Sequence, residues 1–146
     1  IGADHAGYTL KLQLMEMLNA QGHKLVDIGA FEIDPNDDYP DFAKLLAQHI
    51  ASEQGERGIM ICGSGVGASV ATNKVRGVRG AVCHDTYSAH QGVEHDDMNV
   101  LCLGSRIVGI EVAREIVNAF INAKFSGEER HQRRLDKVLK MEESFE

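Results

Sequence analysis

The sequence predicts an α/β fold in which helices cover a parallel β-sheet. Short apolar runs alternate along the chain with longer segments whose apolar residues recur at helical spacing. The run Gly58–Cys62 (GIMIC) is apolar throughout, as is typical of a strand buried on both faces of a parallel sheet. With 146 residues, 43% of them hydrophobic, the chain suits a single domain over 1–146 with right-handed crossovers.

The first elements follow from local patterns. Residues 8–21 place leucines and a methionine at helical spacing, and Gly22 follows as a stop signal. Residues 24–28 alternate as a short strand does, and residues 34–38 form an acidic loop that contains proline and asparagine. A second helix is predicted over 42–53, before the GIMIC strand.

The second half repeats the alternation. After a glycine-rich loop, the patterns predict a helix over 68–75, strands over 80–84 and 100–103, a long helix over 107–123 and a charged C-terminal helix at about 128–143. Strands that alternate with helices in this way imply parallel pairing.

Composition excludes several classes of protein. A formal net charge of -7 argues against nucleic-acid binding, which requires clustered basic residues. No run approaches the roughly 20 apolar residues of a membrane span, and no signal peptide is recognisable. Three cysteines without a CxxC pair predict neither a disulfide framework nor a zinc ribbon. We therefore expect a cytoplasmic protein with no nucleic-acid or membrane partner.

Polar residues gather where the predicted strands end, which is where open parallel sheets bind ligands. The chain opens at Ile1 as though near the end of a strand, and Asp4 and His5 follow at once. His84 follows the strand over 80–84, and Arg106 follows the strand over 100–103. Each histidine either contacts substrate or satisfies a backbone carbonyl.

The loop after the GIMIC strand, CGSGVG, is the most informative junction. Glycines at alternate positions allow successive backbone N–H groups to face one concavity that binds an anion. The loop misses the dinucleotide fingerprint by one residue, lacks the lysine of a P-loop, and does not form a nucleophile elbow around Ser64. Two interpretations remain: an oxyanion cradle with a thiol and a hydroxyl, or a tight turn beside the buried structural cysteine Cys62.

Two further groups of residues each have two interpretations. His95 stands in the acidic run EHDD, but four consecutive residues rarely point at one ion, so we expect no metal site; a solvated loop is the other interpretation. Arg130 and Arg134 lie one helical turn apart, a spacing that suits phosphate. Their alternative role is to pair with Glu128 and Glu129 on a charged helix.

Six ordered segments resemble the ribose-5-phosphate isomerase B family, which includes galactose-6-phosphate and allose-6-phosphate isomerases. They are GADHAG at 2–7, YPDFA at 39–43, CGSGVG at 62–67, NKVRGVRGA at 73–81, NVLCLGSR at 99–106 and ERHQRR at 129–134. The resemblance runs nearly end to end. It implies a Rossmann-like doubly wound sheet, a homodimer or dimer of dimers with shared active sites, and aldose–ketose isomerisation of a small phosphorylated sugar through an enediolate, without cofactor or metal.

The resemblance also implies roles for individual residues, some of them supplied by the partner subunit. Cys62 moves the proton, Ser64 lies near the sugar oxygens, and His95 opens the sugar ring. The implied substrate contacts are Asp4, His5, Tyr39, Gly63, Gly65, Val66, Gly67 and Asp96. The implied phosphate contacts are Arg106, Arg130 and Arg134, with the C-terminal helix contributing to the dimer and the phosphate site.

Three positions refine this resemblance. One branch of the family uses a glutamate where this chain has Ala68, so the cysteine branch fits. Asp96 replaces the usual asparagine, and Gly92 stands where basic residues are common. Isomerisation of ribose 5-phosphate to ribulose 5-phosphate is therefore the first prediction, and a tetrulose phosphate such as erythrulose phosphate or a hexose 6-phosphate is the alternative.

A different class of function also fits part of the pattern. GxGxG after a strand, with Asp85 about 20 residues further on, imitates a dinucleotide fingerprint and would make the chain a non-catalytic nucleotide-binding module. A catalytically silent subunit is a third interpretation, against which the presence of Cys62 argues.

Overall fold

Four parallel strands form the sheet, in the order β1-β2-β4-β3. The computed structural model describes residues 1–143. The strands are β1 (Gly2–Ala3), β2 (Gly58–Cys62), β3 (Gly80–Val82) and β4 (Val100–Gly104). Every residue of β2 pairs with one of β4, from Gly58 opposite Val100 to Cys62 opposite Gly104. This full pairing places the carboxyl ends of the two central strands at the same edge of the sheet.

The segment over 24–28, predicted as a strand, runs beside β1 without forming a regular one. The N–H of Ile28 donates to the carbonyl of the first residue, and the N–H of Ala3 donates to the carbonyl of Gly29. The N–H of Gly29 turns instead to the Asp27 carboxylate, at 2.9 Å. Gly29 has φ +109°, which lies outside the range of a strand, so the backbone does not continue as a regular ladder.

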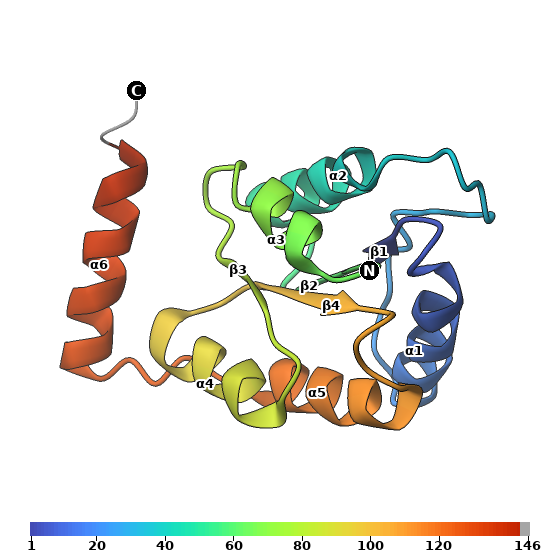
Figure 1. Cartoon of the computed structure of the whole chain (residues 1–146). Helices are drawn as coiled ribbons and strands as arrows, with labels where there is room; N and C mark the ends of the chain where they lie inside the picture. Colours follow the sequence, from blue (N-terminus) through green and yellow to red (C-terminus); the bar gives the residue numbers. More distant parts are fainter. Residues whose placement is uncertain (144–146) are drawn as a thin grey trace.

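Helices cover both faces of the sheet, as the doubly wound prediction requires (Figure 1). One face carries α1 (Tyr8–Ala20), α4 (Thr86–Asp96) and α5 (Ile110–Asn122), and the other carries α2 (Tyr39–Ala51) and α3 (Val66–Thr72). The prediction of fold class is confirmed. Within residues 1–143, no helix combines the length and the apolar character that crossing a membrane requires.

Each face of the sheet has its own apolar core. On one face, Leu14 and Leu18 of α1 meet Phe120 of α5. On the other, Leu46 of α2 packs with Met60 of β2. Burial of one such side chain contributes roughly 1.5–3 kcal/mol, so the two cores hold the strand ends in fixed positions.

Helix α4 was not predicted, because little in its sequence marks a helix. Only Ala89 and Val93 are buried in TYSAHQGVEHD, and Gly92 interrupts the pattern. The Asp85 carboxylate caps its first turn. The acidic run that contains His95 therefore lies mostly in the last turn of a helix, and the interpretation as a solvated loop was wrong.

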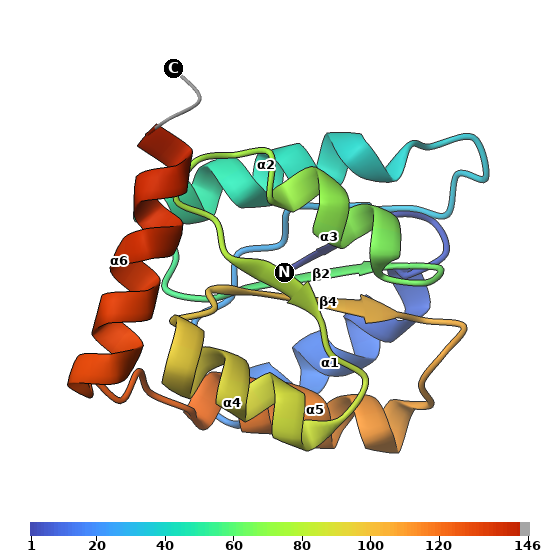
Figure 2. The same cartoon turned by 60° about the vertical axis from the view of Figure 1, so that its left-hand side comes forward.

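The C-terminal helix α6 (Glu129–Glu143) stands outside the two helical layers, beside α4 (Figures 1 and 2). His131 and Leu135 are its buried residues. Near its other end, the Glu142 carboxylate accepts the N–H of Gly77 at 3.2 Å. The rest of α6 is largely exposed, so most of its surface is available to another molecule.

The connections diverge between β1 and β2. From β1 the chain turns outward to the segment over 24–28, whereas from β2 it proceeds to β3 and β4 on the opposite side. A divergence of this kind leaves a crevice beyond the carboxyl ends of the two strands, where α/β proteins bind ligands. Asp4 follows β1 and Cys62 ends β2, so both lie at this crevice.

Candidate active site

A pocket of about 300 Å³ opens at the crevice between β1 and β2. Its lining residues come from four separate loops and strand ends: Asp4, Tyr39, Cys62, Gly63, Ser64, Gly67, Arg106 and Ile107. All but Ile107 were predicted as site residues. A larger cavity, about 620 Å³, lies at the opposite edge of the sheet around Gly58, and none of the predicted site residues lines it.

The Cys62 thiol lies at the base of this pocket. Cys62 is only 4% exposed, and the N–H of Gly65 donates to its Sγ at 3.2 Å. Gly65 has φ +78°, and a Cβ atom there would lie 2.9 Å from the carbonyl carbon of Leu103. Because only glycine fits, the loop can turn tightly enough for an amide to face the sulfur.

Backbone and side-chain bonds join three loops around the thiol. The N–H of Ser105 donates to the Cys62 carbonyl at 2.9 Å, and the N–H of Arg106 donates to the Gly63 carbonyl at 3.1 Å. The Ser105 hydroxyl donates to the carbonyl of Ala6 at 2.7 Å. The exposed guanidinium of Arg106 lies over Gly63, where an added Cβ would meet its Cζ at 3.5 Å. The pocket therefore has a cation on its wall.

Tyr39 and Ser64 form the outer part of the pocket. A Cβ on Gly67 would lie 2.6 Å from Cζ of Tyr39, so the tyrosine ring packs directly on that glycine. The Ser64 hydroxyl accepts the N–H of Val66 at 3.3 Å. The Val66 amide is thus hydrogen-bonded within the loop. The Val66 side chain is exposed and does not line the pocket.

Asp4 and His5 occupy the turn after β1. The buried Asp4 carboxylate accepts the N–H of Gly7 at 3.1 Å. His5 contacts Asp37, a residue that the sequence interpretation placed in an acidic loop without a function. Nδ1 of His5 lies 2.5 Å from Oδ1 of Asp37, and this hydrogen bond raises the pKa of His5.

Asp4, His5 and Asp37 also form a cluster of the kind that can hold a metal ion, with their ligand atoms within 4.8 Å of one another. The 2.5 Å between Nδ1 and Oδ1 is a hydrogen-bond distance. Two ligands of one tetrahedral zinc ion stand roughly 3.3 Å apart, given metal–ligand distances of about 2.0–2.1 Å. The geometry therefore fits a histidine–carboxylate pair.

The remaining predicted residues lie at the opposite edge of the sheet. His95 and Asp96 end α4, directly before β4 begins, whereas Cys62 pairs with the last residue of β4. A strand of five residues spans about 16 Å. Within one chain, His95 and Asp96 are therefore separated from the thiol by the length of the sheet.

The ring of His95 is held by two neighbours. It stacks on His131 of α6, with ring centroids 3.9 Å apart. Its Nδ1 lies 2.8 Å from the amide nitrogen of Gln91, one turn earlier on the same helix. His131 bonds Ser126 at 2.6 Å, and burial lowers its pKa.

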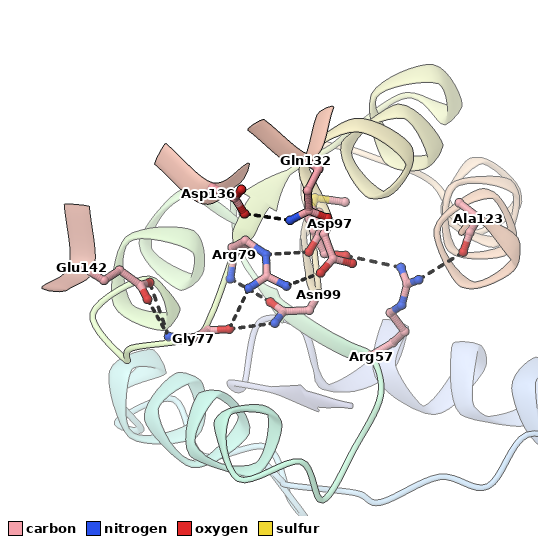
Figure 3. A network of polar contacts seen from close by, with 10 residues as sticks. Arg57, Gly77, Arg79, Asp97, Asn99, Ala123, Gln132, Asp136 and Glu142 are labelled. Carbon is pink, nitrogen blue, oxygen red and sulfur yellow. Dashed lines mark hydrogen bonds and ion pairs between the residues drawn. The ribbon is translucent and has the colours of Figure 1, made fainter. Parts of the chain in front are cut away.

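A polar network fixes the turn that follows His95 and Asp96 (Figure 3). The Arg79 guanidinium donates to the carbonyl of Asp97 at 2.7 Å and to its carboxylate at 2.8 Å. Asp97 has φ +50°, so this clamp holds a left-handed helix end. The Asn99 side chain accepts the N–H of Arg79 at 2.7 Å. Sequence interpretation missed Arg79, because no local pattern links it to Asp97.

The two arginines of α6 that were predicted to bind phosphate, Arg130 and Arg134, are exposed. Nε of Arg130 lies 3.0 Å from the Glu128 carboxylate, which is the charged-helix pairing considered above. Arg134 is one turn further along the same exposed surface. Neither residue reaches the pocket at Cys62 within its own chain, because α6 packs beside α4.

Asp85, the acidic residue of the apparent dinucleotide fingerprint, and its neighbour His84 both have hydrogen-bond partners within the fold. Asp85 accepts the N–H of Ser88 at 2.6 Å, a bond that lowers the pKa of its carboxyl group and caps α4. His84 accepts the N–H of Gly104 at 2.9 Å through Nε2. The carboxylate that would bind a ribose is thus committed to a helix cap.

Known proteins are similar to this chain in sequence and in fold. The chain is 40% identical to ribose-5-phosphate isomerase B from Escherichia coli over 142 residues, which are 97% of this chain and 94% of that one. A ribose-5-phosphate isomerase B structure from Clostridium thermocellum superposes with a TM-score of 0.95 at 41% identity, covering 99% and 97% of the two chains. The Mycoplasma genitalium enzyme with bound ribulose-5-phosphate superposes at 0.93, with 43% identity over 97% and 93%.

Residues 1–138 match the family described as Ribose/Galactose Isomerase. The resemblance predicted from the six segments is confirmed, and the chain belongs to this family.

Proposed function

We propose that this chain isomerises ribose 5-phosphate and ribulose 5-phosphate, with Cys62 as the group that moves the proton. The observation that carries the proposal is a buried thiol at the base of a pocket, facing the N–H of Gly65 and set at the crevice of a doubly wound sheet. The relatives named above are ribose-5-phosphate isomerases, and one of them holds ribulose-5-phosphate.

The reaction requires one base that acts at two adjacent carbons. As a thiolate, Cys62 removes the proton from C2 of the open aldose, and the electrons move onto the carbonyl oxygen at C1 to give an enediolate. The same thiol then returns the proton to C1, while the hydroxyl proton at O2 is transferred to O1. Ser64, exposed at the pocket wall, is placed to assist this oxygen-to-oxygen transfer.

The negative charge of the enediolate requires hydrogen-bond donors and a cation that are already in position. The glycine loop over 63–67 presents backbone at the pocket wall, and the Arg106 guanidinium lies above it. Asp4 and Tyr39 line the same pocket and are the groups that bind the sugar hydroxyls. These residues come from loops joined by hydrogen bonds, so their geometry is fixed before substrate arrives.

The active form is a homodimer with shared active sites. The support is the separation of the predicted residues: the thiol lies at one edge of the sheet, and His95, Arg130 and Arg134 lie at the other. A two-fold axis brings the second group of one copy to the first group of its partner. The partner then supplies His95 to open the sugar ring and the arginines to bind the phosphate.

Exposed apolar side chains lie in the segments that follow β2, β3 and β4 and offer a surface for this assembly. Val66, Val70 and Ile107 are each 58% exposed, and Tyr87 is 66% exposed. Apolar residues clustered beside a site are typical of interfaces between subunits. The buried, free cysteines suit a reducing compartment, and we place the enzyme in the cytoplasm.

The direct test is turnover of ribose 5-phosphate by the purified protein in the presence of a metal chelator, with four- and six-carbon sugar phosphates for comparison. Cys62→Ala should abolish turnover, whereas Cys83→Ala, at a buried thiol outside the pocket, should retain it. Turnover by Cys62→Ala at the wild-type rate would show that Cys62 is not the base. A larger kcat/KM for a tetrose or hexose phosphate would reassign the substrate.

A further inference from the structure

His5 and Asp37 form a pair beside the pocket that joins two distant parts of the chain. The ring Nδ1 of His5 lies 2.5 Å from Oδ1 of Asp37. The backbone N–H of His5 donates to the same oxygen at 3.1 Å. Because one carboxylate oxygen binds both the ring and the backbone of His5, it fixes the position of the residue and the orientation of its ring.

Asp37 lies where few polar groups surround its carboxylate. Its side chain is 11% exposed, and its second oxygen, Oδ2, is buried without a hydrogen-bond partner among residues 1–143. A carboxylate in such a place is costly unless a positive group accompanies it. The hydrogen-bonded partner is His5, so the pair is most stable when the imidazole is protonated.

The groups that face His5 favour its protonated form. The Asp37 hydrogen bond is the main cause of the raised pKa of His5, and the negative charges of Asp37 and Asp4 act in the same direction. Partial burial and the positive charge of Arg106 oppose them without reversing the direction. The positive charge of Arg106 therefore acts on His5, and the bond of 2.7 Å from the Ser105 hydroxyl to the Ala6 carbonyl joins the loops that carry the two cations.

We propose that Asp37 is a positioning residue that holds His5 by Nδ1 and leaves Nε2–H as a donor, beside Arg106, for the anionic group of the substrate. The inference rests on the proposed function only in that a sugar phosphate is the ligand. An imidazolium and a guanidinium together match a doubly charged phosphate. Asp37 acts on the substrate only through His5.

The first test compares Asp37→Asn with Asp34→Asn. Both variants remove one carboxylate from the same loop and keep an amide oxygen that accepts the existing N–H bond. Asp37→Asn should raise the KM for ribose 5-phosphate roughly tenfold above neutral pH, the scale of one lost charge-assisted hydrogen bond. Its kcat should change little. Asp34→Asn should have the wild-type KM, and equal KM values for the two variants would overturn the proposal.

The pH dependence supplies a second readout. Binding of the substrate phosphate requires protonated His5. The substrate is therefore bound below the pKa of His5, and binding is lost as the pH rises through that pKa. Because Asp37 raises that pKa, the alkaline fall of kcat/KM should move to lower pH in Asp37→Asn. In a His5→Asn background, Asp37→Asn should cause no further change in KM. An additional rise in KM there would show that Asp37 does not act through His5.

A measurement independent of turnover separates this inference from the proposed function. The ring proton of His5 can be titrated by NMR in the free protein, with inorganic phosphate as the anion. The inference expects a lower pKa of His5 in Asp37→Asn than in Asp34→Asn, and a weaker response to phosphate. If His5 shows this difference but the protein has no isomerase activity, the proposed function is wrong and the inferred role of Asp37 is supported. If the protein is active but the pKa of His5 is the same in both variants, Asp37 does not position His5 and the inference is wrong.

Discussion

Two inactive variants should regain activity when they occupy the same dimer. Cys62→Ala chains keep His95, and His95→Asn chains keep Cys62. In a mixed dimer with shared sites, one site combines both intact residues and the other combines both substitutions. The mixed dimer should therefore have about half of the wild-type activity per dimer, because one of its two equivalent sites is complete.

The structure explains why this recovery requires two copies. The strand β4 separates the end of α4 from the level of Cys62 by about 16 Å. A catalytic acid or base must lie within roughly 3 Å of the atom it serves. No side-chain rotation of His95 spans that distance inside one chain, whereas the proposed two-fold partner is expected to bring the residue to the pocket.

The assay uses two chains with different affinity tags, co-expressed and purified through both tags so that every dimer is mixed. The matched control joins Cys62→Ala with Arg106→Gln, two changes at the same edge of the sheet, which leave no site intact. Recovery with His95→Asn and none with Arg106→Gln is the expected result. Absence of a doubly tagged species, or equal activity in both pairs, would refute the shared site.

Three further predictions concern packing and stability. Gly67→Ala should displace Tyr39, because its Cβ would lie 2.6 Å from Cζ, and should raise the KM for ribose 5-phosphate; Gly109→Ala, where no atom lies within 4 Å, should not. Lys11→Met should lower the free energy of unfolding in urea by about 3 kcal/mol, because it leaves Asp27 without its buried partner at 2.6 Å; the exposed Lys44→Met should change it by less than about 0.5 kcal/mol. Burial lowers the pKa of His131, so the unfolded chain binds its proton more readily and stability falls as pH drops below about 6.5. Thermal unfolding of His131→Phe should therefore be less sensitive to pH below that value, and an unchanged slope would contradict the assignment.

The elements that a local pattern marks were predictable from the sequence. The continuous apolar run GIMIC indicates a strand that is buried on both faces, and the helical spacing of the leucines in α1 indicates one buried face. Helix α4 shows neither, because only Ala89 and Val93 are fully buried where it packs between α5 and α6. The segment over 24–28 alternates like a strand, but the positive φ of Gly29 ends its regular pairing with β1.

The candidate site was predictable only where topology determines position. Parallel strands bring their carboxyl ends to one edge, so Asp4, Cys62 and Arg106 could be expected together. The partnership of His5 with Asp37 depends on the path of an irregular loop across 32 positions, which no spacing encodes. The position of His95 also required the structure, because a pattern that does not mark α4 cannot show at which edge of the sheet that helix ends.

The division of the site between two edges of the sheet separates proton transfer from substrate capture. Cys62 and the glycine loop lie at the end of the fully paired strands β2 and β4, and hydrogen bonds from Ser105 and Arg106 hold them. That geometry belongs to each chain alone. In the dimer proposed above, His95, Arg130 and Arg134 serve the site of the partner, so we expect assembly to govern ring opening and phosphate binding. We therefore expect weakening of the proposed dimer to impair substrate binding and ring opening, while the position of the thiol against its loop stays unchanged.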